Sequence, residues 1–170
     1  MPRRRPFPYA ERAERVRNAQ RALNEAGRHP LFEGRDSALG AFWAALGSAL
    51  PPEFDAALLR ARSGDPNGAD VLIAFLEADP FFFRSGYYKA DAAQYLKRVP
   101  LTEPQQARLR AAILKVVSTR DGREFRRYCR LAQHLDAPAF RIELQQLAEA
   151  PDAATRRRAG WVLAALSLAP

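Results

Sequence analysis

The sequence predicts an all-α domain in which antiparallel helical hairpins stack into a short α-solenoid. Apolar residues recur with the 3.6-residue period of a helix along almost the whole chain, and no segment alternates apolar and polar residues as a half-buried strand does. Turns rich in Gly, Pro and Asp divide the chain into about nine such segments. Because the connections are short, consecutive helices are expected to run antiparallel. The 170 residues suit a single domain with a substantial core.

Four helices are expected before the middle of the chain. Gly27 stops the first helix, Asp36 or Ser37 caps the second, and a Pro-Pro pair separates the second helix from the third. The turn at residues 63–68 ends the third helix, and the fourth stops before Pro80. The expected apolar faces are Tyr9, Ala13, Val16, Gln20 and Leu23; Leu39, Phe42, Trp43, Leu46 and Leu50; Phe54, Leu58 and Leu59; and Val71, Leu72, Phe75 and Leu76.

An aromatic segment at residues 81–88 lies near the middle of the chain and holds five of its seventeen aromatic residues. We expect its three phenylalanines to fill the gap between stacked helical pairs as part of the core. Helical phase places Tyr88 on a buried face. Tyr87 faces neither side of the core, so the residues expected to reach a groove are Tyr87, Arg84 and Lys89.

Five more helices are expected after this segment. Ser85 caps the fifth, Thr102 opens the sixth, Asp136 caps the eighth and Pro151-Asp152 starts the ninth. The seventh follows an Asp-Gly break and runs to about His134. Outside the seventh helix, the expected apolar faces are Tyr88, Ala92, Tyr95, Leu96 and Val99; Leu109, Ala112, Ile113, Val116 and Val117; Phe140, Leu144, Leu147 and Ala148; and Ala159, Val162, Leu163 and Leu166.

The last helix resembles the second helix of a HEAT repeat. In that family an apolar or β-branched residue precedes an Arg, and a small residue and two apolar residues follow at fixed spacing. Here these positions and an upstream Asp are Thr155, Arg156, Ala159, Leu163, Leu166 and Asp152. The resemblance implies a curved right-handed stack with a concave groove that binds another macromolecule. Residues 83–131 are also similar to uncharacterised bacterial proteins, a similarity that implies no activity.

The seventh helix has one apolar face and one arginine face. The apolar face is Phe125, Tyr128, Cys129, Ala132 and Leu135. The opposite face is Arg123, Arg126, Arg127, Arg130 and His134. Such a row is either a solvated helix face or a binding site for an anionic partner, which would turn the mutual repulsion of like charges into attraction. Cys129 is expected to be structural because it lies on the apolar face.

A tryptophan near the end of the chain is expected to point outward. If the apolar face of the last helix is buried, Trp161 lies outside it, beside Arg157. Either a neighbour or a cation–π contact with Arg157 covers Trp161, or the two residues form a docking patch at the open end of the stack.

The net charge of +8 at pH 7 favours acidic partners. Residues 1–8, which contain Arg3-Arg4-Arg5 between prolines, are expected to form a disordered basic arm before a single domain at residues 9–170. No apolar run reaches the ~18 residues of a membrane span, and no secretory signal is expected. With one Cys an internal disulfide is excluded, so the expected location is the cytoplasm, without membrane association.

The favoured function is that of a non-catalytic adaptor or scaffold that binds an acidic protein. The alternative is a nucleic-acid-binding protein that places the arginine face on phosphates. A less favoured alternative is a HEAT-like DNA glycosylase, whose catalytic residues have no matching positions here. The two histidines are far apart, and no Gly-rich phosphate loop or nucleophile motif occurs, so neither a metal nor a cofactor is expected.

Overall fold

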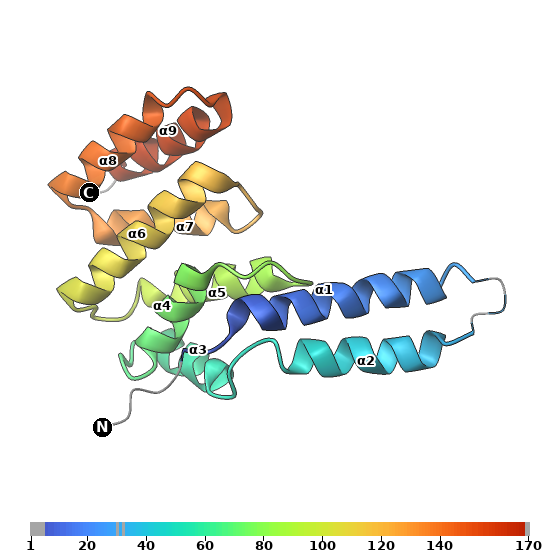
Figure 1. The fold of residues 1–170 in the computed structure, drawn as a ribbon. Helices are drawn as coiled ribbons and strands as arrows, with labels where there is room; N and C mark the ends of the chain where they lie inside the picture. The colour runs from blue at the N-terminus through green and yellow to red at the C-terminus, as the bar shows by residue number, and fades with distance from the viewer. Residues whose placement is uncertain (1–5, 30, 32, 169–170) are drawn as a thin grey trace.

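The computed structural model describes residues 6–29, 31 and 33–168, and every regular element within them is helical (Figure 1). The predicted all-α class is confirmed for these residues. The elements are α1 (Tyr9–Ala26), α2 (Arg35–Gly47), α3 (Phe54–Arg62), α4 (Ala69–Ala78), α5 (Ser85–Leu96), α6 (Glu103–Thr119), α7 (Phe125–Ala132), the short 3₁₀ helix η1 (Gln133–Leu135), α8 (Pro138–Ala148) and α9 (Ala153–Ser167). Of the helices described, none is both long and apolar enough to cross a bilayer.

Seven of the helices form two rows. Helices α4, α6 and α8 pack against one another in succession and are called here the even row. Helices α3, α5, α7 and α9 do the same and are called the odd row. Figure 1 shows the pairs α8–α9, α6–α7 and α4–α5 following one another through the molecule. The core between the rows includes Leu72, Phe75, Ile113, Tyr128 and Val162.

Helices α1 and α2 form a hairpin that projects from these rows (Figure 1). Tyr9 anchors its base, because the Tyr9 ring lies 5.6 Å from the ring of Phe75 in α4. The sequence predicts that α2 buries Leu39 and Trp43 together with Phe42. That prediction is correct for Phe42 and wrong for the other two, which are exposed because α2 packs against α1 along one side only.

Polar side chains cap two of the described helices at the starts that the sequence predicts. Thr102 begins α6 with a capping box, and the Asp152 carboxylate accepts a 2.8 Å hydrogen bond from the Thr155 N–H at the start of α9. Asp136 does not cap α8. Its carboxylate instead accepts two hydrogen bonds from the Arg141 guanidinium, of 2.8 and 2.6 Å.

The aromatic segment at residues 81–88 divides between core and surface. Phe82 is buried, and Tyr88 is half-buried with its ring 6.1 Å from that of Phe54. Phe81 is 69% exposed and Phe83 is 40% exposed, so the prediction that all three phenylalanines fill the core is wrong for these two. The turn that leads into α5 can direct only the middle phenylalanine inward.

Four charged side chains, called here the buried charge cluster, join α4 and α6 to α5 and α7. Lys89 Nζ lies 2.7 Å from Asp79 Oδ1, and the Arg120 guanidinium donates hydrogen bonds to the carboxylates of both Asp79 and Glu124. Burial lowers the pKa of Lys89, and the Asp79 carboxylate opposes that shift. Gly122 belongs here because a Cβ at this position would collide with the Glu124 carboxylate.

Candidate binding surface

Tyr87 stands on the exposed side of α5 between two arginines. The guanidinium carbon of Arg123 lies 4.6 Å from the centroid of the Tyr87 ring, and that of Arg84 lies 5.9 Å from it. Arg84 precedes α5 in the left-handed region, with φ of 66°, and directs its side chain toward this ring. Arginine stacked on an aromatic face keeps its hydrogen-bond donors available at the edge of the plane.

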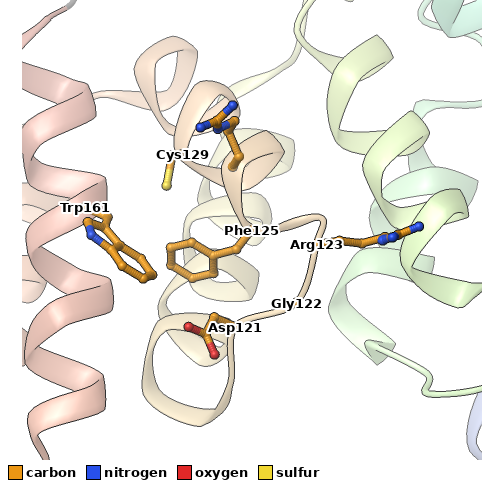
Figure 2. A pocket seen from close by; sticks show the side chains of 7 residues that line it. Asp121, Gly122, Arg123, Phe125, Cys129 and Trp161 are labelled. Atoms are coloured by element: carbon orange, nitrogen blue, oxygen red, sulfur yellow. The ribbon is translucent and has the colours of Figure 1, made fainter.

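A second arginine–aromatic contact lies on α9. The Arg157 guanidinium carbon is 5.4 Å from the centroid of the Trp161 ring, which also packs edge-on against Phe125 with the ring centroids 5.8 Å apart. Figure 2 shows these two rings next to each other in the wall of an open pocket of about 640 Å³. The residues that line it are Asp121, Gly122, Arg123, Phe125, Arg126, Cys129 and Trp161.

A neighbouring pocket of about 500 Å³ continues this surface toward α1. It is lined by Arg17 and Gln20 of α1, by residues 81–87 and by residues 120–124. Both pockets have Asp121, Gly122 and Arg123 in their walls, so Arg123 stands between them. We call the following set the arginine–aromatic surface: Arg84, Tyr87, Arg123, Arg126, Arg157 and Trp161.

The arginines of this surface have almost no carboxylate partners. Among the residues described, no ion pair involves Arg84, Arg123 or Arg126. Arg157 lies 3.8 Å from the Asp121 carboxylate, which is the long end of an ion-pair distance. The surface therefore carries positive charge that the fold itself does not neutralise.

The basic residues of α6, in the even row, are all engaged. The Arg108 guanidinium binds the Glu77 carboxylate through two hydrogen bonds of 2.8 and 2.6 Å. Arg110 donates a 2.7 Å hydrogen bond to Glu103, and Lys115 Nζ donates one of 3.0 Å to the Glu77 carbonyl. These residues do not extend the arginine–aromatic surface.

A separate group of cations lies around Lys97. Burial, followed by the charges of Arg130, Arg127 and Arg98, lowers the pKa of Lys97. Burial and then Lys97 lower the pKa of His134. Arg127 is half-buried and donates a 2.8 Å hydrogen bond to the side-chain oxygen of Gln94. Like charges therefore crowd around Lys97.

The structure thus sorts the ten predicted site residues into three places. Six form the arginine–aromatic surface, and a second group is Arg130 near the end of α7, His134 in η1 and Arg127 in the first turn of α7, all of which interact electrostatically with Lys97. The sequence predicts that Lys89 reaches a groove, but Lys89 is 1% exposed and bound to Asp79. Helical phase missed this pairing because the partner belongs to α4. The predicted Arg3-Arg4-Arg5 arm lies outside the described residues.

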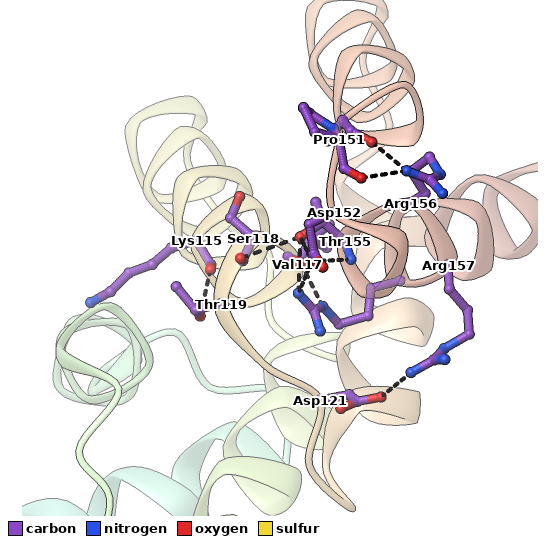
Figure 3. A network of polar contacts seen from close by, with 12 residues as sticks. Lys115, Val117, Ser118, Thr119, Asp121, Pro151, Asp152, Thr155, Arg156 and Arg157 are labelled. Carbon is purple, nitrogen blue, oxygen red and sulfur yellow. Dashed lines mark hydrogen bonds and ion pairs between the residues drawn. The ribbon is translucent and has the colours of Figure 1, made fainter.

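Polar contacts in the first turns of α9 hold this helix against α6 (Figure 3). The buried Arg158 guanidinium donates a 2.6 Å hydrogen bond to the Val117 carbonyl of α6 and a 3.0 Å bond to the Thr155 hydroxyl. Figure 3 shows Arg157 extending away from this network toward Asp121. Arg158 therefore holds the helix in place, while the neighbouring Arg157 lies against Asp121 and Trp161, two residues that line the pocket.

Cys129 lines the first pocket without being poised for chemistry. Burial raises the pKa of its thiol to about 11, so the reactive thiolate is scarce at neutral pH. Groups of three or more His, Cys, Asp or Glu side chains with metal-site geometry do not occur among the described residues.

Sequence reasoning missed the exposure of Trp43, Phe81 and Phe83. A signal for Trp43 was present, because α2 has only two charged residues among thirteen. A helix so apolar must leave part of its surface uncovered unless it is surrounded by other helices.

No family model, curated protein or solved structure matches this chain. Its function must be inferred from the geometry of its own residues.

Proposed function

We propose that this protein is a non-catalytic adaptor that binds an acidic protein partner through the arginine–aromatic surface. The observation that carries the proposal is the combination of unpaired guanidinium groups with exposed Tyr87 and Trp161 rings around two adjoining pockets. Arg, Trp and Tyr are the residues that most often dominate the binding energy of protein interfaces. Carboxylates of a partner would supply the charge that the fold leaves unmatched.

We further propose that the two helical rows are a short cytoplasmic α-solenoid of the HEAT-like kind. Successive packing within each row and the pattern of residues in α9 support this. In such stacks an exposed helical row commonly serves as an extended binding surface. The odd row, which carries Tyr87, Arg126 and Trp161, is that row here.

Nucleic-acid binding is a second candidate, favoured by the position of Tyr87 and Trp161 beside arginines. Aromatic rings next to cations are the stacking platforms of single-strand binding proteins. Asp121 weighs against it, because this carboxylate lines both pockets and would repel a phosphate backbone that passed through them. A protein segment, by contrast, can place a hydrogen-bond donor against Asp121 and carboxylates against the arginines.

The test is fluorescence anisotropy with labelled probes at low and moderate salt. The probes are a Glu/Asp-rich peptide, duplex DNA and single-stranded DNA and RNA. The acidic peptide is expected to bind more tightly than any of the nucleic acids, and more weakly at moderate salt. Reversing Arg123, Arg126 and Arg157 to Glu should weaken peptide binding at least about tenfold.

The matched control reverses Arg15 and Arg21, which are exposed on α1, and Arg28, which is exposed just after it, and changes the net charge by the same amount. This control should retain most of the affinity. Equal losses in the two triple variants would mean that net charge alone attracts the peptide. Tighter binding of any nucleic acid would favour the second candidate.

A further inference from the structure

The arginine–aromatic surface continues into an exposed aromatic row beside the middle of the α1–α2 hairpin. Phe42 lies between Trp43 and Phe83, with ring centroids 5.3 and 5.5 Å from theirs. Trp43 is 54% exposed, and Phe83 and Phe81 are also exposed. An apolar side chain on a surface is ordinary when it stands alone. Here two exposed rings, Trp43 and Phe83, pack on one buried ring, and the exposed Phe81 lies two residues before Phe83, which marks an interaction site.

The segment that carries Phe81 and Phe83 is held by hydrogen bonds. Arg17 of α1 donates a 2.6 Å hydrogen bond to the Phe81 carbonyl, and the Phe82 N–H donates one of 3.2 Å to the Ser85 hydroxyl. Arg84 completes the turn in the left-handed region, which is uncommon for a residue other than glycine. The fold therefore presents Phe81 and Phe83 to solvent in a defined position.

Apolar and cationic groups occupy opposite sides of this site. Phe83 faces α2 through its contact with Phe42, whereas Tyr87 faces α7 through its contact with Arg123. The pocket between them is lined by Arg17, by residues 81–87 and by residues 120–124. A ligand that enters it meets aromatic rings along one edge and guanidinium groups along the other.

We propose that the segment of the partner that binds here is an acidic amphipathic helix, an inference that rests on the proposed function. A helix presents apolar side chains at i, i+3, i+4 and i+7 along one face and charged side chains along its flank. Its apolar face packs on Phe81, Phe83 and Trp43. Its flanking carboxylates meet Arg84 and Arg123, which have no ion pair among the described residues.

Charge complementarity selects this occupant over a second copy of the chain. Each copy has a net charge of +8, and a copy docked here would bring two cationic surfaces together. Charge complementarity also disfavours a purely apolar helix, because such a helix would partly desolvate the guanidinium groups of the site without giving them a partner.

Three labelled peptides of about 18 residues test this, a length at which a designed sequence can form a helix. The first is an amphipathic peptide of Leu and Glu with Leu at helical spacing. The second has the same composition in an order that scatters Leu around the helix. The third is a Glu-rich peptide without Leu. The amphipathic peptide is expected to bind the full chain at least about tenfold more tightly than the other two.

The double variant Phe81→Ala/Phe83→Ala should remove most of that preference and leave binding of the Glu-rich peptide within about twofold. The control is Leu59→Ala/Leu168→Ala, which truncates two exposed leucines elsewhere and should change nothing. Thermal unfolding followed by circular dichroism checks that both variants keep their fold.

Each outcome decides a different claim. Equal affinity for the amphipathic and scattered peptides, or an unchanged preference in the Phe81/Phe83 variant, overturns this inference and leaves the proposed function intact. If none of the three peptides binds, both fail. If single-stranded DNA displaces the amphipathic peptide and loses affinity in the same variant, the rings stack on bases and the inference is wrong.

Discussion

Partly exposed arginines of the even row and arginines of the arginine–aromatic surface on the odd row serve opposite purposes. On the even row, Arg108 is bound by two hydrogen bonds to Glu77, and Arg141 is bound in the same way to Asp136. On the odd row, Arg123 and Arg126 have no carboxylate partner among the described residues, and Arg123 lies against Tyr87. Arg108 and Arg141 each stabilise the fold by binding a carboxylate. Arg123 instead stacks on an aromatic ring, and its guanidinium remains available to a partner.

The comparison teaches that net charge alone does not locate a binding surface. The chain carries 27 basic and 19 acidic residues, yet the basic residues of α6 are matched by acids or carbonyl groups. The excess is concentrated on α7 and its neighbours in the odd row. Substitutions should therefore affect stability in one region and binding in the other.

The largest effect is expected from the buried charge cluster. Lys89→Met removes the buried ammonium group that pairs with Asp79. This change should lower the free energy of unfolding by about 3–5 kcal/mol, the usual cost of removing one partner of a buried ion pair. Urea unfolding measures this. A loss below about 1 kcal/mol would show that Arg120 alone satisfies Asp79.

A smaller effect is expected from two glycines, Gly122 in the loop before α7 and Gly160 inside α9. Gly122→Ala should cost about 1–3 kcal/mol, because the new Cβ would collide with the Glu124 carboxylate. Gly160→Ala meets nothing within 4 Å and should stabilise α9 by about 0.5–1 kcal/mol. Thermal unfolding of both variants compares them. The same sign of change in both would contradict the packing around Glu124.

The sequence was informative wherever a local physical signal decides the structure. Apolar periodicity predicted the helices, and Thr102 and Asp152 predicted where two of them begin, whereas the caps predicted at Ser85 and Asp136 do not form. Helical phase also predicted the outward orientation of Tyr87 and Trp161, both of which are exposed. These features depend only on neighbours within one or two helical turns.

Features that depend on distant partners could not be predicted from the sequence. Lys89 lies ten positions after Asp79, and the fold alone determines that α4 and α5 bring them together. Trp43 is exposed because α2 has one helical neighbour, a fact about topology that apolar periodicity does not encode. The joining of Tyr87 to Arg123 across α5 and α7 has the same origin.

The smallest stability effect is expected at Asp136, where the hydrogen bonds from Arg141 lower the pKa of the carboxyl group. Because its pKa is lower in the folded state, Asp136 contributes stability above the unfolded pKa of about 3.9, and this contribution is lost as pH falls through the folded pKa. Asp136→Asn should cost at most about 1 kcal/mol near pH 7. Urea unfolding at pH 7 and near pH 2 should show the difference from wild type vanishing in acid, and a difference that persists would contradict the ion pair.

The most direct test of the division between the rows compares Arg126→Ala with Arg108→Ala. Each variant is measured for acidic-peptide affinity by anisotropy and for stability by urea unfolding. Arg126→Ala should lower the affinity for the acidic peptide about three- to tenfold and leave the free energy of unfolding within about 0.5 kcal/mol of wild type. Arg108→Ala should cost about 0.5–1 kcal/mol of stability and leave affinity within about twofold. Peptide affinity that falls in the Arg108 variant and is unchanged in the Arg126 variant would contradict the assignment of binding to the odd row.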